Sequence, residues 1–151
     1  MKDHELFMKE CIALGKEALK MGNPPVGAIV VKNNKVIGKG LELAKSSKNI
    51  AKHAEIEAVK NVLNNGFQNL EKCALYTTHK SYLMCAYVLR TYKLEILVYG
   101  IEVLHIGGVS SEFNIMNTSN VPNWTNPPII IGGVLKEECK SLSNEKKHNN
   151  G

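Results

Sequence analysis

Apolar residues near the start of the chain recur every three or four positions, which predicts an amphipathic helix over residues 7–21. Its apolar stripe consists of Phe7, Cys11, Leu14, Ala18 and Met21. A Gly-Asn-Pro-Pro run at residues 22–25 ends this pattern. Two β-rich runs follow at residues 26–31 and 35–40, and Asn33 and Asn34 lie in the short turn between them. This arrangement is typical of a β-hairpin.

The rest of the chain alternates helical and strand patterns. Small and branched apolar residues predict a helix over residues 50–65, which ends at an Asn-Asn-Gly stop. Further strands are expected at residues 73–77, 95–100 and 128–131, and further helices at residues 84–92 and 134–142. Because the helices connect successive strands as crossovers, the pattern indicates an α/β sheet covered on both faces. We expect one domain over residues 1–143 and a polar, frayed tail over residues 144–151.

Residues 107–128 form the least regular part of the sequence and are rich in Ser, Asn, Gly and Pro. A segment of this length without regular structure is usually a functional or lid-like loop in a compact domain. Phe113 and Trp124 lie in it and are candidates for stacking on a bound ring. Packing in the core or a dimer contact explains both aromatic residues equally well.

Composition limits the class of protein. The chain has 151 residues, 44% of them hydrophobic, which is enough for one domain with a core of its own. Its longest apolar runs are far shorter than the roughly 20 residues that cross a bilayer, and its first residues lead straight into the amphipathic pattern. We therefore expect a cytoplasmic protein without a membrane span. The four cysteines are widely spaced, which argues against a disulfide framework.

Charge argues against a nucleic-acid partner at this stage. The formal net charge is +5, but the 19 basic residues are 18 lysines and a single arginine, Arg90. Reading of base edges and clamping of phosphate both favour the bidentate fork of arginine. The lysines are also scattered along the chain, so a solvated surface is the favoured interpretation.

Candidate chemistry centres on His53 and Glu55, two residues apart where a helix is expected to begin. Residues two apart in a regular helix point about 200° from each other, so both serve one site only near the first turn. The simpler alternative is a surface histidine and a glutamate favoured by the helix dipole. Downstream, a strand and a loop lead to Cys85 at another helix start, where backbone amides favour the thiolate that binds zinc.

His53-Ala54-Glu55 followed by this cysteine resembles the cytidine and deoxycytidylate deaminase superfamily, whose signature is H-x-E and then P-C-x-x-C. The sequence is most similar to the branch of guanine, cytosine and tRNA adenosine deaminases, and residues 23–28 and 75–77 resemble two of its strands. The resemblance implies a three-layer α/β/α fold with a mixed sheet of about five strands, and often a homodimer. It also implies His53 and Cys85 as Zn²⁺ ligands and Glu55 as the catalytic proton shuttle.

The sequence departs from that family at three positions. Tyr82 stands where the first cysteine ligand belongs, Lys80 replaces a glutamate, and Glu42 replaces an asparagine that contacts substrate. His53 and Cys85 are only two of the three protein ligands that a catalytic zinc normally has. His79 in the same loop is a possible third ligand, although an ordinary loop histidine is the more common case. Tyr82 can instead fill the vacated site, hydrogen-bonded to His53 or Glu55.

Two functions follow from these residues. The first is a zinc-dependent hydrolytic deaminase of a nucleobase, nucleoside or related small heterocycle, with an altered metal site. The second is a catalytically silent, zinc-free binding or partner subunit. In both, the resemblance assigns Glu42, Ala54 and Tyr82 to the substrate pocket. A tRNA-editing enzyme is a weaker third interpretation because of the single arginine.

Overall fold

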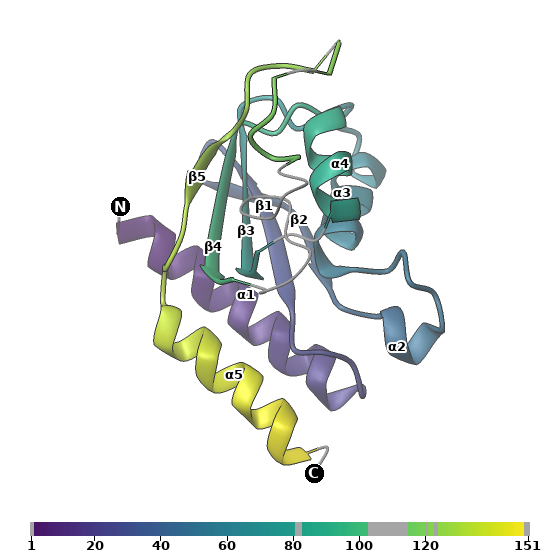
Figure 1. The fold of residues 1–151 in the computed structure, drawn as a ribbon, viewed down its shortest axis with the longest axis vertical. Coiled ribbons are helices and arrows are strands. Elements are labelled where there is room, and N and C mark those ends of the chain that lie inside the picture. The colour runs from purple at the N-terminus through teal and green to yellow at the C-terminus, as the bar shows by residue number, and fades with distance from the viewer. Residues whose placement is uncertain (1, 81–82, 103–114, 120, 123, 150–151) are drawn as a thin grey trace.

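The computed structural model describes residues 2–80, 83–102, 115–119, 121–122 and 124–149. It contains five helices and five strands in these residues (Figure 1). The helices are α1 (Lys2–Lys20), α2 (Ala44–Ser47), α3 (Ala54–Asn64), α4 (Leu83–Thr91) and α5 (Lys136–Asn149). The strands are β1 (Gly27–Lys32), β2 (Lys35–Leu41), β3 (Cys73–His79), β4 (Ile96–Ile101) and β5 (Ile129–Ile131).

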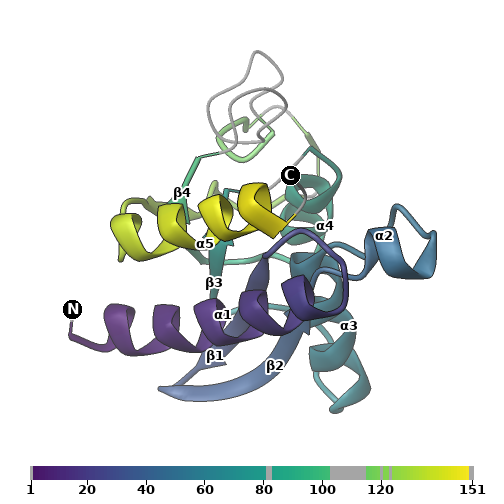
Figure 2. The same ribbon diagram turned by 90° about the horizontal axis from the view of Figure 1, so that it is seen from below.

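The strands form one mixed sheet in the order β2-β1-β3-β4-β5. The pairs on either side of β1 are antiparallel, and β3, β4 and β5 run parallel. Helices α1 and α5 lie together on one face, and α3 and α4 lie on the other (Figures 1 and 2). Each face buries its own apolar cluster. The predicted three-layer α/β/α fold is therefore confirmed.

The turn between β1 and β2 follows directly from its sequence. Asn33 and Asn34 both have positive φ angles, 52° and 62°. Asparagine tolerates this left-handed conformation better than most residues, and two such residues in succession match the right-handed twist of a hairpin. The predicted hairpin is confirmed.

Several helix boundaries differ from the sequence prediction, and α1 begins already at Lys2. Helix α1 ends at Lys20, which leaves Met21 55% exposed. The second long helix begins at Ala54 and not at Ile50, which is 82% exposed, and residues 43–52 form a separate projecting segment. Helix α5 continues to Asn149, so most of the expected frayed tail is helical. The end of α5 is rich in glutamate and lysine, which favour helix formation. These residues form no apolar stripe, so the hydrophobic pattern did not predict this part of the helix.

Close packing of β2 against α3 positions the candidate site. A side chain at Gly40 would collide with the carbonyl oxygen of Ala54 and the backbone nitrogen of Ala58. The glycine thus lets the start of α3 lie directly on β2. This contact sets Glu42, just beyond β2, against the first turn of α3.

No helix in the described part of the chain is both long and apolar enough to cross a membrane.

Candidate functional site

His53 is the N-cap residue of α3, with φ −75° and ψ 152°, but its side chain does not cap the helix. Glu42 supplies this interaction from outside, because its Oε1 atom accepts a hydrogen bond from the Ala54 backbone N–H at 3.1 Å. The first backbone N–H groups of a helix have no partner within the helix, so this acceptor stabilises the start of α3. Glu42 and Ala54, two of the residues assigned to the substrate pocket from the resemblance, therefore contact each other.

The other oxygen of Glu42 faces His53. Glu42 Oε2 lies 3.1 Å from His53 Nδ1, and the two side chains are 5% and 20% exposed. The hydrogen bond to Glu42 raises the pKa of His53 above its ordinary value, against the opposing effect of burial. His53 thus has an acidic partner on the nitrogen that faces the pocket floor.

Glu55 lies deeper, with 3% of its surface exposed. Its Oε1 atom accepts a hydrogen bond from the Thr77 hydroxyl at 2.8 Å, and its Oε2 atom accepts one from the Cys85 thiol at 3.3 Å. Burial raises the pKa of Glu55, and the hydrogen bonds from Thr77 and Cys85 oppose this rise. The carboxyl group is accordingly able to hold a proton at a higher pH than an exposed glutamate.

A cavity of about 320 Å³ opens beside His53 and Glu42. Its walls are mainly apolar, and its polar groups come from these two residues and from Lys45. It is lined by Pro24, Val26, Glu42, Ala44, Lys45, Ile50 and His53. A few polar groups in an apolar pocket of this size are typical of a site for a small planar ligand. A larger groove of about 610 Å³ between α1 and α5 contains none of the predicted site residues.

The structure does not bring His79 to His53 and Cys85. Its Nδ1 atom lies 2.8 Å from the Thr78 hydroxyl, and its Nε2 atom lies 2.9 Å from the hydroxyl of Ser143 on α5. Helix α5 covers the opposite face of the sheet from α3 and α4. The His79 ring thus contacts α5, whereas Thr77, two residues earlier in β3, contacts Glu55.

Of the other residues singled out in the sequence, Lys80 is described by the structure and Tyr82 is not. Lys80 is only 3% exposed and donates its backbone N–H to the carbonyl of Ile101, so this basic residue is buried. Tyr82, which the sequence places in the missing ligand position, lies outside the described residues, as does Phe113.

The described side chains do not fit a zinc ion. No group of three His, Cys, Asp or Glu residues among them is arranged to hold a metal. His53 Nδ1 faces Glu42, and the Cys85 thiol donates to Glu55. A catalytic zinc normally needs three protein ligands and an open position. No chemical step is therefore assigned to a metal here.

Sequence reasoning did not identify Thr77 as a partner of Glu55. The only available signal was the alternation of β3, in which Leu75 and Thr77 face the same side while Tyr76 faces the other. A threonine on the buried, apolar side of a strand needs a hydrogen-bond partner, and Glu55 provides it.

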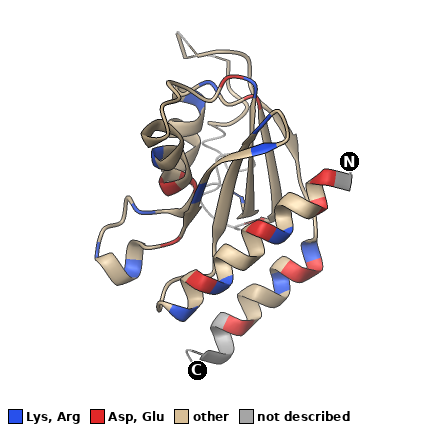
Figure 3. Cartoon of the chain, turned by 180° about the vertical axis from the view of Figure 1, so that it is seen from behind, with Lys and Arg blue, Asp and Glu red and all other residues tan. Residues whose placement is uncertain are grey.

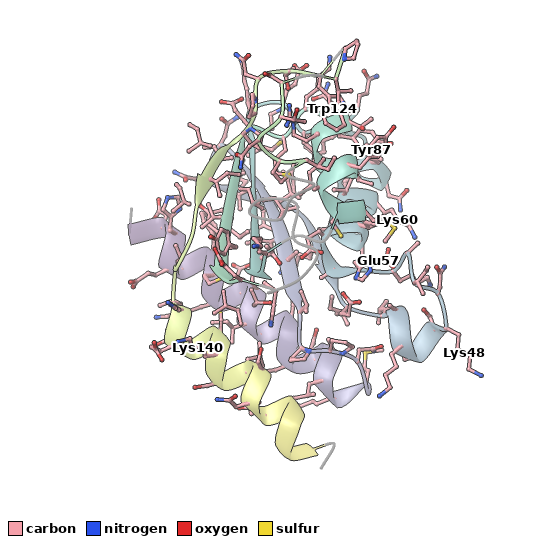
Figure 4. All side chains as sticks on the ribbon, viewed as in Figure 1. Lys48, Glu57, Lys60, Tyr87, Trp124 and Lys140 are labelled. Atoms are coloured by element: carbon pink, nitrogen blue, oxygen red, sulfur yellow. The ribbon has the colours of Figure 1, made fainter. Side chains whose placement is uncertain are left out.

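Trp124, a predicted stacking candidate, already has partners. The Arg90 guanidinium lies 4.7 Å from the centre of its ring, and the Tyr87 ring packs against it at 5.8 Å (Figure 4). Arg90 is 1% exposed and donates hydrogen bonds to three backbone carbonyls, those of Ile115, Met116 and Thr125. Trp124 thus takes part in packing, which was the alternative interpretation.

Comparison with known proteins agrees with this fold. The model of the cytidine and deoxycytidylate deaminase zinc-binding region matches residues 1–101. The α/β/α fold and the placement of His53, Ala54 and Glu55 at the start of α3 define a deaminase-like protein. The chain belongs to the cytidine and deoxycytidylate deaminase family.

Its relatives include enzymes named as tRNA deaminases. The chain is 35% identical over 147 residues to the tRNA-specific adenosine deaminase of Aquifex aeolicus, covering 93% of this chain and 96% of the relative. It is 32% identical over 143 residues to tRNA-specific adenosine deaminase 2 of Xenopus tropicalis, covering 90% and 84%.

Solved structures share the fold. One, from a study of A-to-I editing by tRNA:A34 deaminases, superposes with a TM-score of 0.82 at 23% identity, covering 90% of this chain and 97% of that chain. Another, a guanine deaminase of Nitrosomonas europaea, has a TM-score of 0.72 at 18% identity, covering 95% and 84%.

Proposed function

We propose that this protein is a zinc-free member of the deaminase family that acts as a binding or partner subunit. The observation that carries this proposal is the 3.1 Å contact between Glu42 Oε2 and His53 Nδ1. A histidine nitrogen must be neutral and have a free lone pair to bind a metal. Glu42 favours a proton on Nδ1, so that nitrogen is engaged by the carboxylate and is not open to a metal.

The other candidate ligand is engaged in a similar way. The Cys85 thiol donates a hydrogen bond to the Glu55 carboxyl at 3.3 Å, so its sulfur atom is engaged by an acidic group. The sequence adds Tyr82 at the first cysteine position, and a neutral phenol is a poor substitute for a thiolate. These three features together support a pocket that binds without metal-assisted hydrolysis.

A hydrolytic deaminase with an altered metal site is the second candidate. The observation that favours it is the buried Glu55 carboxyl between Thr77 and Cys85. Its raised pKa suits a group that takes up and releases a proton, which is the role that the family resemblance gives it.

The pocket and the relatives together favour a nucleobase carried in RNA as the partner. The cavity of about 320 Å³ suits one planar ring, and relatives at 32% and 35% identity are named as acting on tRNA. The low arginine content argued against a nucleic-acid partner. The names of these relatives favour such a partner. A free heterocycle and the homodimer implied by the resemblance stay predictions.

Zinc content separates the two candidates. We expect protein purified without added metal to contain well under one zinc per chain by mass spectrometry, and to release no ammonia from adenosine, guanine or cytosine. The double variant Glu42→Asn, Tyr82→Cys restores the residue types of the family and is expected to take up zinc. Stoichiometric zinc in the natural chain that is lost in His53→Ala would overturn the proposal in favour of the deaminase.

A further inference from the structure

Residues 43–52, which we call the lysine arm, project from the body of the protein beside the candidate pocket. The arm contains α2 and lies away from the sheet in two perpendicular views (Figures 1 and 2). Its charged residues are Lys45, Lys48 and Lys52, and it contains no aspartate or glutamate. Figure 3 shows only basic colour on it, whereas α1 and α5 carry both signs of charge.

The arm is held in place by hydrogen bonds. At its base, the backbone N–H of Leu43 donates to the carbonyl of Lys52 at 3.0 Å, which closes the two ends on each other. The buried side chain of Asn23 pairs with Ser46 twice, at 2.9 Å through its amide and at 2.8 Å through its oxygen. The lysines are therefore presented from a fixed loop, which reduces the entropy lost when they bind a partner.

The lysines of the arm have no acidic partners. Within the described residues, no ion pair involves Lys45, Lys48 or Lys52. Several lysines outside the arm also form no ion pair among the described residues, but three that do are suitable for a matched comparison. Ion pairs join Lys60 to Glu57 at 3.2 Å, Lys93 to Glu71 at 3.5 Å and Lys140 to Glu137 at 3.8 Å. In Figure 4, Lys48 lies at the tip of the arm and points into solvent, far from Lys60 and Lys140.

The arm is continuous with the pocket. Lys45 and Ile50 belong to the arm and also line the cavity that contains Glu42 and His53. Ile50 is 82% exposed, so an apolar side chain stands open at the same rim. A ligand in the cavity therefore lies beside the basic arm, and a neutral free base would make no use of its charges.

We propose that the lysine arm binds the phosphate backbone of a single-stranded RNA whose base enters the adjacent pocket. This inference rests on the proposed function and assigns the surface that holds its partner. Phosphate contacts supply most of the affinity for nucleic acid and carry no base information, and lysine makes them as a point charge without the bidentate fork of arginine. The single, buried Arg90 argues against base reading by arginine, and here the pocket takes that role.

The test compares two variants with the same loss of charge. The arm variant is Lys45→Gln, Lys48→Gln, Lys52→Gln, and the control is Lys60→Gln, Lys93→Gln, Lys140→Gln. Fluorescence anisotropy measures the affinity of each for a labelled single-stranded RNA of about 15 nucleotides, a length that fits a single-strand site. Titration at several salt concentrations gives the slope of log affinity against log salt, and circular dichroism checks that each variant is folded.

We expect the arm variant to bind roughly tenfold more weakly than the natural chain and to lower the salt slope by about 2, since each single-strand phosphate contact adds about 0.7. The control should keep most of its affinity and slope. Equal weakening in both variants would overturn the arm as a specific surface, although the proposed RNA partner would stand. Failure of the natural chain to bind RNA, or arm-dependent binding to phosphatidylserine vesicles in its place, would overturn both.

Discussion

Glu42 Oε2 and His53 Nδ1 lie 3.1 Å apart at the entrance to α3, where the family resemblance implies a substrate contact and a metal ligand. The same carboxylate accepts the Ala54 N–H through its other oxygen. The glutamate at position 42, where the family usually has an asparagine, thus contacts both His53 and Ala54 at the start of α3. Because a carboxylate favours a protonated imidazole, the pair alters the electrostatics of the pocket without changing the fold.

Glu42→Gln is expected to lower the pKa of His53. The neutral amide removes the acidic partner that raises it, while the lowering effect of burial remains. The stabilisation from the pair is fully present below the ordinary histidine pKa of 6.5 and is lost as pH rises through the higher folded value. Its size should be on the order of 1 kcal/mol, because His53 is partly open to solvent. Titration of the imidazole signals by NMR measures the shift directly.

Glu57→Gln provides the control for that measurement. Glu57 also lies in the first turn of α3 but pairs with Lys60 at 3.2 Å. Its removal should leave the His53 titration nearly unchanged. An unchanged pKa of His53 in Glu42→Gln would mean that the two side chains do not pair in solution.

Glu55→Gln is expected to stabilise the protein at neutral pH. Burial raises the pKa of Glu55, so the folded state prefers the protonated carboxyl and loses stability as pH rises above the ordinary value of 4.5. Glutamine has no such cost, and its amide oxygen can still accept the Thr77 hydroxyl. Thermal unfolding should show a higher Tm for the variant at pH 8 and little difference near pH 4. A lower Tm at pH 8 would show that the ionised carboxylate is well satisfied by its partners.

The sequence specified most of the fold because its signals are local. The Asn33-Asn34 turn and the apolar periods of residues 7–21 and 73–77 each depend on neighbouring residues only. The start of α3 was placed four residues too early, because Ile50 and Ala51 continue an apolar pattern that belongs to the lysine arm. Nothing in the local pattern indicates that these residues leave the core.

In the candidate site too, the residues within one local motif could be predicted, whereas their distant partners could not. His53, Ala54 and Glu55 were found because they lie in one motif, and their link to Glu42 depends on the packing of β2 against α3. The contacts of Glu55 with Thr77 and Cys85 join residues 22 and 30 positions apart. The direction of the His79 ring depends on Ser143, 64 positions away. Partners at such separations are set by tertiary structure, which spacing in the sequence does not encode.

Gly40→Ala is expected to destabilise the protein by about 1–3 kcal/mol, the usual cost of an added methyl group in a well-packed core. The new methyl would meet the backbone of Ala54 and Ala58 and push the start of α3 away from β2. Urea denaturation measures the loss of free energy of unfolding. The neighbouring change Lys39→Ala is the control, because that side chain is 58% exposed and should cost less than about 0.5 kcal/mol. Equal midpoints for the two variants would contradict the proposed close contact.

Arg90→Lys is expected to destabilise the protein by at least about 2 kcal/mol although the charge is kept. The guanidinium donates to the carbonyls of Ile115, Met116 and Thr125 and also stacks on Trp124. A lysine ammonium has no planar fork to reach these separated acceptors, so buried carbonyls lose their partners. Trp124 is the only tryptophan, so its fluorescence reports this region alone. In folded Arg90→Lys we expect the tryptophan emission to shift to longer wavelength and the urea midpoint to fall. The control is Lys93→Ala, on the exposed surface after α4, which should change neither the emission nor the midpoint. An unchanged emission spectrum in Arg90→Lys would mean that the arginine does not hold Ile115, Met116 and Thr125 against α4.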